Sequence, residues 1–512
     1  MRVRAAFFVK LPIHFFNRCC MVRIVSMSLM LVYLFLGMKV VAVGPAKPLF
    51  RNGQWRAVLQ RKDGHEIVFN FEVRDSAGRK ILYIRNAGER LLVDDIRVQG
   101  DSVLIRLPFF ESQLRAVLTP AGNLDGVWLK RGVDTYQSVA FQATYGQAAR
   151  FPAEGTTTMS GRIKSGGTAG TTGGAGTAAK TGGVGNAGVT GGVETAGTTS
   201  GAGTAGATEN AGTTGKTGNT GTTGKKGNNG KAGYPDVSGR WKAVFRAPDD
   251  KDTTLRVGEF EQKGARVTGT FLDAGGDLRY LEGVVTGDSL KLSCFDGGHA
   301  YLFTAGIRGD SLTGGQFFAG ASGYEVWTAD KDAGAKLPDE FSITRWRKDA
   351  GPLAFTFRDI DGQSVSLSDA RFKGKVLLIQ IMGSWCPNCM DETRFLSDFY
   401  KEYQPRGVEI IGLAYERSTD FERSQGSLRS FQERFGVKYP MLITGVAVGD
   451  PQRTEKTLPQ LEQINNFPTT IFVNKKGEIE LIHTGFSGPG TGVHYEEQKK
   501  EFYTTVDRLL GE

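Results

Sequence analysis

The feature that most constrains the fold of this chain is an apolar run that leads directly into two cysteines. Residues 376–382 form this run, and a short apolar run of this kind predicts a buried strand. Gly-Ser-Trp follows it, and then come Cys386 and Cys389 with two residues between them. Residues 390–403 carry apolar side chains at helical spacing, so we expect Cys386 to lie at the mouth of a helix.

A cysteine at the beginning of a helix is well placed for thiol chemistry. The unpaired backbone N–H groups and the positive end of the helix dipole favour a thiolate over a thiol at that position. Pro387 fits the first helical turn, because its missing N–H has no helical partner there. We therefore predict that Cys386, the outer residue, attacks a disulfide and that Cys389, one turn further inside, resolves the mixed disulfide.

Two other uses of this cysteine pair fit the sequence less well. A C-x-x-C pair can be half of a zinc site, but a closed site needs two more ligands at usable spacing. The chain offers only Cys294 far upstream and isolated histidines. A structural disulfide usually closes a longer loop than this one. We therefore expect no metal and no cofactor at this pair.

The C-terminal part of the chain, from about residue 351 to the end, resembles the TlpA/ResA-like extracytoplasmic thiol–disulfide oxidoreductases, which have a thioredoxin fold. The resemblance rests on three features, which are Trp385-Cys386-Pro387-Asn388-Cys389, Glu392, and Phe467-Pro468-Thr469-Thr470-Ile471-Phe472-Val473. It implies an α/β thioredoxin-like domain. Alternation and helical spacing along this part predict a hairpin, a strand, an insertion that ends in a helix, a strand and a closing helix, over residues 355–367, 408–414, 416–435, 478–483 and 495–510.

The same resemblance assigns substrate-binding residues. The segment that begins at Phe467 matches the family's cis-proline strand, and Pro468 falls at the cis position. The resemblance implies that this proline faces the two cysteines and that Phe467 pairs with the backbone of the substrate. Trp385 would belong to the same substrate-binding surface. A cis bond before proline is uncommon in folded proteins, so we expect this one to serve the site.

Glu392 has two interpretations. It matches the carboxylate that ResA-like members carry after their C-x-x-C motif, where it tunes the thiols and shuttles protons. The alternative is an ordinary acid near the beginning of a helix, stabilised by the helix dipole. The resemblance implies the catalytic set Cys386, Cys389 and Glu392, and a disulfide between the two cysteines in the oxidised form. Gln380 stands where thioredoxin has a buried acid, which leaves the proton route open.

The first 46 residues differ in composition from the rest of the chain. They hold six basic residues and no acid, so they account for six of the nine net positive charges. The charge that remains is small and scattered, so we expect no nucleic-acid partner. Residues 24–43 are apolar and follow Arg18 and Arg23, and small residues over 42–46 offer a cleavage site. Together these features predict a secretory signal.

Two fates of this segment stay open. A cleaved signal would place the protein in the periplasm or cell envelope, whereas an uncleaved segment of near-spanning length would leave it anchored in the inner membrane. Met21 is an alternative start, because the region before the apolar run is unusually long. Cys19 and Cys20 precede the apolar run and so do not support a lipid anchor. Either way, we expect the body of the protein to be exported.

Two stretches of the chain, 53–145 and 237–329, show the period-two alternation of apolar and polar residues that predicts strands. They resemble each other in the matching segments 53–58 and 239–244, and 100–105 and 287–292. Many short strands with close turns predict a small antiparallel barrel or sandwich, present twice. Neither copy holds a catalytic constellation, so we expect these β modules to bind a partner or to position the redox domain.

The alternation also predicts which residues of the β modules face inward. Trp55 and Trp241 are expected to be core anchors rather than platforms for a ligand. Val127 and Leu129 belong to the same alternation of apolar and polar residues, which predicts a strand there. Cys294 continues the alternation of its strand, so we expect a buried core thiol, and a redox partner is the alternative.

Between the two β modules lies sequence rich in Gly, Thr and Ala. From residue 167 to residue 233, glycine falls at nearly every third position, which is the spacing of collagen. The segment contains no proline, and the period is broken at four positions. We expect a flexible linker, and a trimerising stalk is the alternative. An oligomer is expected only if this segment trimerises.

The chain thus divides into six predicted segments, which are a signal or anchor (1–46), a first β module (47–150), a linker (151–235), a second β module (236–331), a connector (332–350) and a thioredoxin-like domain (351–512). We infer an exported thiol–disulfide oxidoreductase that reduces disulfides of extracytoplasmic proteins, with electrons from a membrane thiol donor, as the resemblance implies. Two alternatives stay open. One is a surface or envelope interaction protein whose β modules bind a partner. The other is a thiol peroxidase, although Gly383 stands where peroxiredoxins need a threonine.

Overall fold

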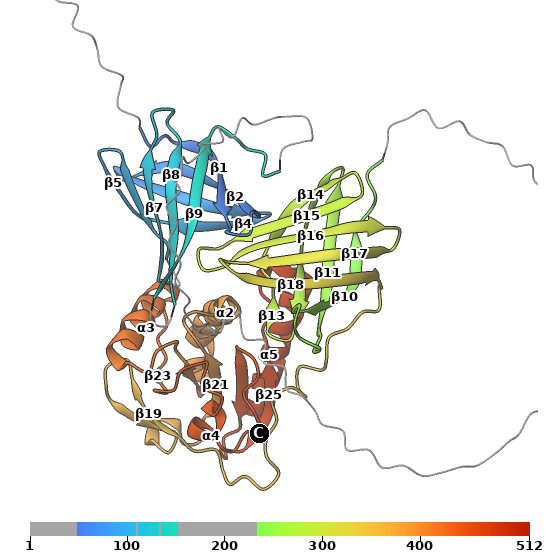
Figure 1. Ribbon diagram of the computed structural model, residues 1–512. Coiled ribbons are helices and arrows are strands. Elements are labelled where there is room, and N and C mark those ends of the chain that lie inside the picture. Colours follow the sequence, from blue (N-terminus) through green and yellow to red (C-terminus); the bar gives the residue numbers. More distant parts are fainter. Residues whose placement is uncertain (1–48, 109–110, 133–134, 152–232) are drawn as a thin grey trace, which may run out of the picture. The chain divides into compact units, whose positions relative to one another are not determined.

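The computed structural model describes residues 49–108, 111–132, 135–151 and 233–512 (Figure 1). The predicted signal or anchor segment and the glycine-rich segment lie outside these ranges, so both remain predictions. Among the helices in the described ranges, none combines the length and the apolar character that crossing a bilayer requires. Residues 48–512 group into one unit by their contacts, and this unit contains three sheets.

The first sheet has nine strands, namely β1 (Gly53–Gln60), β2 (Glu66–Ser76), β3 (Arg79–Asn86), β4 (Glu89–Val93), β5 (Asp95–Gln99), β6 (Ser102–Arg106), β7 (Ser112–Leu118), β8 (Leu124–Arg131) and β9 (Tyr136–Tyr145). Their order is β4-β3-β2-β1-β9-β8-β7-β6-β5, and every neighbouring pair is antiparallel. Side chains at alternate positions therefore share one face and form the core of this sheet.

The second sheet also has nine antiparallel strands, namely β10 (Gly239–Arg246), β11 (Thr254–Lys263), β12 (Arg266–Asp273), β13 (Gly276–Asp277), β14 (Leu281–Thr286), β15 (Ser289–Phe295), β16 (Ala300–Arg308), β17 (Ser311–Ala319) and β18 (Gly323–Lys331). Their order is β11-β10-β18-β17-β16-β15-β14-β12-β13. Strand β11 also pairs with β12, so the sheet closes on itself as a barrel. The short strand β13 extends from β12 as a hairpin.

The two sheets repeat one topology, in agreement with the matching sequence segments. In each sheet the first strand pairs with the second strand and with the last. Trp55 in β1 and Trp241 in β10 are fully buried. The indole N–H of each donates to the backbone oxygen of the residue four positions earlier, Arg51 at 3.1 Å and Val237 at 2.9 Å. The prediction that both tryptophans are core anchors is confirmed.

The strand predicted around Val127 and Leu129 is confirmed as β8, but these two residues do not form its inner face. Val127 and Leu129 are only half-buried, whereas Trp128 between them is 2% exposed. The inner face carries Leu124, Gly126 and Trp128, and a Cβ on Gly126 would lie 2.0 Å from a backbone oxygen of β7. Because glycine has no side chain, the inward positions of this strand do not stand out in the alternation of apolar residues.

The third sheet has seven strands, namely β19 (Thr356–Asp359), β20 (Ser364–Ser366), β21 (Val376–Met382), β22 (Val408–Ala414), β23 (Met441–Ile443), β24 (Thr469–Val473) and β25 (Ile479–Thr484), in the order β20-β19-β23-β22-β21-β24-β25. Strands β21, β22 and β23 are parallel, and β24 runs antiparallel to β21. The helices are α2 (Pro387–Tyr403), α3 (Phe421–Phe435), α4 (Arg453–Thr457) and α5 (Val493–Gly511), with 3₁₀ turns η1 (Ala370–Phe372), η2 (Gln404–Arg406) and η3 (Pro489–Thr491).

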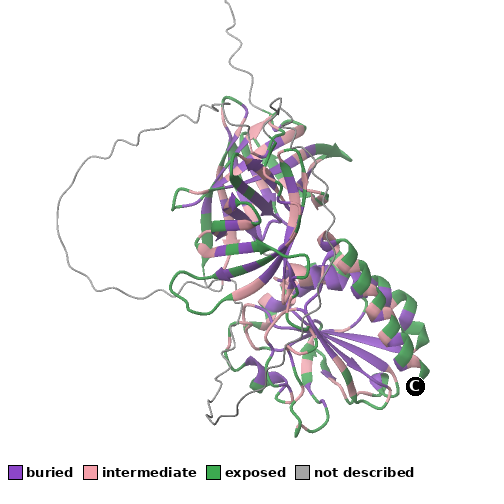
Figure 2. Ribbon diagram, turned by 90° about the vertical axis from the view of Figure 1, so that its right-hand side faces the viewer, coloured by how far each residue is buried: buried purple, intermediate pink, exposed green. Residues whose placement is uncertain are grey.

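The central strands of the third sheet are buried on both faces. Every residue of β21, β22 and β24 is buried, as Figure 2 shows for the middle of this sheet. One face packs against α2 and α5, and the other packs against the segment that follows α4. The observed elements confirm the predicted strand over 376–382 and the predicted helix that begins after Cys386. This is the mixed α/β arrangement that the resemblance implies.

The paired tryptophans give a test of the core of the second sheet. We expect Trp241→Phe to lower the free energy of unfolding by about 1–3 kcal/mol beyond the loss of packing, because it leaves the buried Val237 oxygen without its donor. Trp327→Phe is the matched control, since Trp327 is 2% exposed and its indole N–H has no hydrogen-bond partner in the described structure. Denaturant unfolding followed by circular dichroism measures both variants, and equal losses would contradict the role of this bond.

Candidate active site

The two cysteines of the C-x-x-C motif lie where β21 leads into α2. Cys386 caps the helix: its backbone is extended (φ −102°, ψ 118°), and its Sγ accepts a hydrogen bond from Cys389 N at 3.3 Å. Pro387 occupies the first turn, as predicted. The sulfur of Cys386 thus accepts one of the backbone N–H groups that have no partner within the helix.

The two thiols have different surroundings. Both cysteines are free thiols, and Cys386 is 4% exposed whereas Cys389 is 0% exposed. Burial raises the pKa of Cys389 well above its usual value, and the adjacent sulfur of Cys386 raises it further. The thiol of Cys389 is therefore held in its protonated form. The order of attack and the disulfide of the oxidised form stay predictions.

The chain segment before β24 lies against Cys386. The bond between Phe467 and Pro468 is cis. The Cys386 thiol donates to the backbone oxygen of Phe467 at 3.5 Å. The ring of Trp385 packs edge-on against the ring of Phe467, with the two centroids 5.5 Å apart. The structure therefore brings the predicted substrate-binding residues together beside the outer cysteine.

Glu392 is buried behind the cysteines. It is the sixth residue of α2, it is 0% exposed, and it is not among the acids of the first turn, which has none. Its carboxylate accepts hydrogen bonds from Gln380 Nε2 and from Thr470 Oγ1, both at 2.7 Å. Burial raises the pKa of Glu392 to about 7, although these two bonds oppose the shift. The charge of Glu392 in turn helps to raise the pKa of Cys389, after burial and the neighbouring Cys386. These surroundings favour the interpretation in which Glu392 couples to the thiols.

Gln380 organises this buried group, and its partners do not follow from the sequence alone. Its amide also contacts Thr393 Oγ1 at 3.1 Å. Gln380 and Thr470 lie directly opposite each other in the β21–β24 pairing, which is why both reach the carboxylate. Two buried polar residues on neighbouring strands are a usable signal, but only once the register of the two strands is known.

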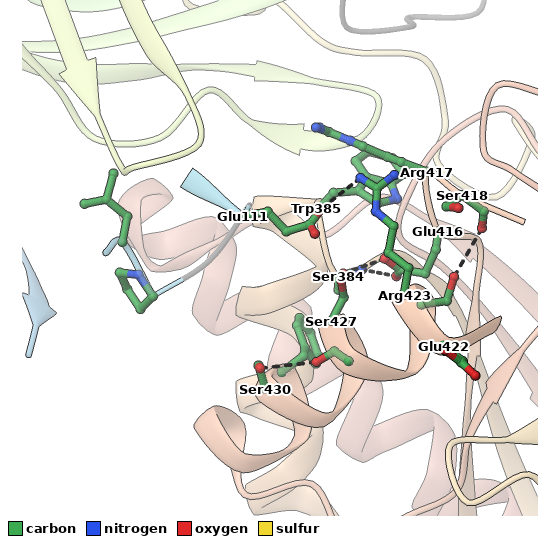
Figure 3. A pocket seen from close by; sticks show the side chains of 15 residues that line it. Glu111, Ser384, Trp385, Glu416, Arg417, Ser418, Glu422, Arg423, Ser427 and Ser430 are labelled. Carbon is green, nitrogen blue, oxygen red and sulfur yellow. Dashed lines mark hydrogen bonds and ion pairs between the residues drawn. The ribbon is translucent and has the colours of Figure 1, made fainter. Parts of the chain in front are cut away.

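A cavity of about 410 Å³ lies beside Trp385 (Figure 3). On its wall, Glu416 accepts hydrogen bonds from the backbone N–H of Ser384 at 2.8 Å and from its hydroxyl at 2.7 Å. Burial raises the pKa of Glu416, against the effect of these bonds. The Arg417 guanidinium lies 5.7 Å from the centre of the Trp385 ring. The cavity thus offers a polar, charged wall next to the predicted substrate surface.

The first sheet completes this cavity. Arg423 on α3 donates to Glu111 Oε2 at 2.8 Å, and Glu111 precedes β7. An insertion that ends in a helix, as predicted for residues 416–435, does not by itself indicate this wall. The missed signal is the charged run that directly follows β22, because sites in α/β sheets form at the carboxyl ends of parallel strands.

Cys294 takes no part in this site. It lies in β15, is 0% exposed and belongs to the core cluster of the second sheet. Burial raises the pKa of its thiol well above the usual value, which keeps it protonated and unreactive. The prediction of a buried core thiol is confirmed.

One group in the described part of the chain has side chains of the metal-binding type close together, formed by Glu340, His483 and Glu501. Their ligand atoms lie within 4.8 Å of one another, whereas ligands around one zinc ion lie roughly 3.4 Å apart, given its bond lengths. The Nδ1 of His483 is already hydrogen-bonded to the backbone oxygen of Gly485 at 3.1 Å, and burial lowers the pKa of His483 to about 4. We assign no metal to this group, and His483 is a strand residue with a satisfied partner.

Residues 349–482 match the model of the AhpC/TSA family. Together with the sheet order and the C-x-x-C helix, this match defines the C-terminal part of the chain as a thioredoxin-like domain. Within that class, its similarity is to ResA. The thiol-disulfide oxidoreductase ResA of Halalkalibacterium halodurans is 30% identical over 132 residues, which cover 26% of this chain and 65% of the relative. The ResA of Bacillus subtilis is 25% identical over 131 residues, which cover 26% of this chain and 64% of the relative.

The chain therefore spans somewhat less than two thirds of these relatives. Among solved structures, a putative thiol:disulfide interchange protein DsbE from Chlorobium tepidum is 17% identical, with a TM-score of 0.25, covering 32% of this chain and 99% of that one. StoA from Bacillus subtilis is 22% identical, with a TM-score of 0.21, covering 30% of this chain and 97% of that one.

The buried carboxylate makes stability depend on pH. The pKa of Glu392 is about 7 in the folded protein and about 4.5 when exposed, so protonation of this group stabilises the folded state. This stabilisation is fully present below pH 4.5 and is lost as pH rises through 7. For a carboxylate whose pKa is shifted this far, the free energy of unfolding falls by on the order of 3 kcal/mol over this pH range. We expect Glu392→Gln to weaken this pH dependence, as measured by denaturant unfolding at pH 5 and pH 8.

Glu402→Gln is the control for this prediction, because Glu402 is an exposed glutamate on the same helix. It should leave the difference in stability between the two pH values as it is in the wild type. The same slope in Glu392→Gln and in the wild type would mean that the buried carboxylate is not the titrating group.

Proposed function

We propose that this protein is a thiol–disulfide oxidoreductase whose Cys386–Cys389 pair reduces disulfides in other proteins. The observation that carries the proposal is the free dithiol at the N-terminus of α2, with the cis Phe467–Pro468 bond against its outer thiol. The names of the ResA relatives support the same activity. Their similarity covers the thioredoxin-like domain only, so the activity of the whole chain is part of the proposal.

The reaction would proceed in two exchanges. The Cys386 thiolate attacks one sulfur of the substrate disulfide, which breaks that S–S bond, forms a mixed disulfide and releases the other substrate sulfur as a thiolate that takes up a proton. Cys389 then gives up its proton and attacks Cys386 Sγ. This second exchange forms the Cys386–Cys389 disulfide and releases the second substrate thiol. Two electrons have then passed from the dithiol to the substrate, and a thiol donor must restore the pair.

Glu392 is suited to move the proton in the second exchange. Cys389 is held protonated, so it must lose its proton before it attacks. A group whose pKa is about 7 accepts and returns a proton near neutral pH at little cost. We therefore assign to Glu392 the role of base for Cys389 and of acid when the pair is reduced again.

The thiol peroxidase alternative does not fit the site. Peroxiredoxins need a threonine at the position of Gly383, as noted above. A Cβ at Gly383 would lie 2.2 Å from the indole nitrogen of Trp385, whose N–H donates to the Tyr415 oxygen at 2.8 Å. A threonine would therefore require the tryptophan to leave its place against Phe467.

Export and electron supply belong to the proposal as well. The apolar segment over residues 24–43 supports an exported protein of the periplasm or cell envelope, either cleaved or anchored at its N-terminus. A protein that reduces disulfides outside the cytoplasm needs electrons from the membrane, so we assign it a membrane thiol donor. The linker interpretation of the glycine-rich segment gives no reason to propose an oligomer.

A trap tests the function. We expect Cys389→Ser to hold a disulfide-bonded model protein, such as insulin, in a covalent complex that dithiothreitol dissolves, because the second exchange is blocked. Cys386→Ser should form no such complex, and Cys294→Ser should behave as the wild type. Non-reducing gels and peptide mass spectrometry identify the bond. A complex through Cys389 in the Cys386→Ser variant, or no complex at all, would contradict the assignment.

A further inference from the structure

A hairpin of the second sheet reaches the dithiol site. Strands β12 and β13 are joined by a tip made of residues 274–275. The backbone oxygen of Gly275 accepts hydrogen bonds from Asn388 Nδ2 at 2.9 Å and from the backbone N–H of Phe486 at 3.3 Å. Asn388 stands between the two cysteines of the motif. The tip is therefore bonded to the C-x-x-C turn itself.

The tip also lies beside the edge to which a substrate would bind. A Cβ added to Gly275 would be 3.4 Å from the backbone oxygen of Phe467. The same oxygen accepts the Cys386 thiol at 3.5 Å. A polypeptide that presents a disulfide to Cys386 and pairs with Phe467 would need this space. The small exposed fraction of Cys386, 4%, agrees with an occupied groove.

The fit between the tip and the redox domain is backbone against backbone. Gly276 has φ +133°, and a Cβ there would lie 2.1 Å from the Phe486 oxygen. On the other side, a Cβ on Gly485 would lie 2.6 Å from the Ala274 oxygen. Gly485 donates to the Pro468 oxygen at 2.8 Å, so it belongs to the cis-proline edge. Only glycines permit this approach at both positions.

Buried charges hold the base of the hairpin. Arg279, which follows β13 and is 8% exposed, forms ion pairs with Asp391 on α2 at 2.5 Å and with Glu89 on β4 at 2.9 Å. Asp277 in β13 accepts a hydrogen bond from the Gly488 backbone at 2.9 Å. Arg279 adopts φ +64°, a strained conformation for a residue other than glycine. Such strain persists where the surroundings fix a conformation, often at functional sites.

We propose that the β12–β13 hairpin is an intramolecular occupant of the substrate groove, and that a protein disulfide reaches Cys386 only after the tip moves away. This inference rests on the proposed function, since it takes the Phe467 edge as the place where substrate binds. Only molecules with an uncovered groove react, so the equilibrium between covered and uncovered forms sets the apparent reactivity of the dithiol. A substrate that supplies its own backbone to this groove replaces the bonds of the tip and shifts that equilibrium.

A crosslink tests whether the tip lies where a substrate cysteine would lie. In the full chain with Cys389→Ser, Gly275→Cys places a thiol at a position whose nearest neighbours leave room for a side chain. Oxidised glutathione serves as the oxidant: it takes two electrons and two protons from the introduced thiol and Cys386, which become joined by an S–S bond, and leaves as two reduced glutathiones. We expect this intramolecular disulfide as the main product, mapped by peptide mass spectrometry.

The control for the crosslink is Gly264→Cys in the same background. Gly264 lies in the β11–β12 turn, at the opposite end of β12, with no atom within 4 Å of an added Cβ. This variant should form mixed disulfides with glutathione and no bond to Cys386. Equal yields of the Cys386 bond in the two variants, or none in the Gly275→Cys variant, would overturn the proposal.

A second variant displaces the tip. Gly276→Ala brings a methyl group onto the Phe486 oxygen, so it should raise the rate at which a poly(ethylene glycol) maleimide alkylates Cys386 in the reduced protein by about tenfold or more. Gly264→Ala is the matched control, because Gly264 also has a positive φ but touches nothing. It should alkylate at the wild-type rate. Equal rates in Gly276→Ala and in the wild type would overturn the proposal.

These tests separate the hairpin from the catalytic proposal. Crosslinking and alkylation need only a reactive Cys386 thiol, so they report on the cover even if other proteins prove not to be substrates. Conversely, insulin trapping that proceeds at equal rates in Cys389→Ser with and without Gly276→Ala would support the function and reject the cover.

Discussion

The antiparallel pairing of β21 with β24 is the contact on which the whole site depends. Strand β21 ends just before the C-x-x-C motif, and β24 begins just after the cis-proline, so pairing these strands brings the two ends together. The same register sets Gln380 opposite Thr470, and both donate to the carboxylate of Glu392. A slip of one residue would turn these side chains to the other face and would separate the carboxylate from its donors.

The buried carboxylate shows what this pairing makes possible. Burying an ionised group without partners is strongly unfavourable, and two hydrogen bonds offset only part of that cost. The outcome is a pKa of about 7, between that of an exposed glutamate and that of a fully isolated one. A cysteine with a raised pKa needs a nearby base that is neither fully charged nor fully neutral at physiological pH. In the proposed reaction, the energetic compromise at Glu392 therefore has a chemical use.

The parts of the site that the sequence predicted are local in the chain. A strand, a C-x-x-C turn and a helix follow one another within residues 376–403, and the cis-proline segment has its own short signature. The parts that it did not predict depend on distant pairs. The partners of Glu392 follow from a strand register, the inner face of β8 was hidden by Gly126, and the cavity beside Trp385 needs Glu111 from another sheet. The bond between Gly275 and Asn388 joins residues 113 positions apart. Periodicity reports which face of a strand is buried, but not what covers it.

Arg279 links all three sheets, because its guanidinium meets Glu89 of the first and Asp391 of the redox helix while its backbone follows β13. Buried ion pairs add little stability relative to apolar packing, but removing one partner leaves a buried charge at a cost of several kcal/mol, so they fix geometry. The tip beyond Arg279 is held differently, by two hydrogen bonds to the Gly275 oxygen, each worth a net of about 0.5–1.5 kcal/mol. Uncovering Cys386 by moving whole sheets would break the charged cluster, whereas bending the hairpin at Gly276, before Asp277, would break only the weaker bonds. The comparison favours a fixed frame made by the two β modules and a small movement at the glycine tip.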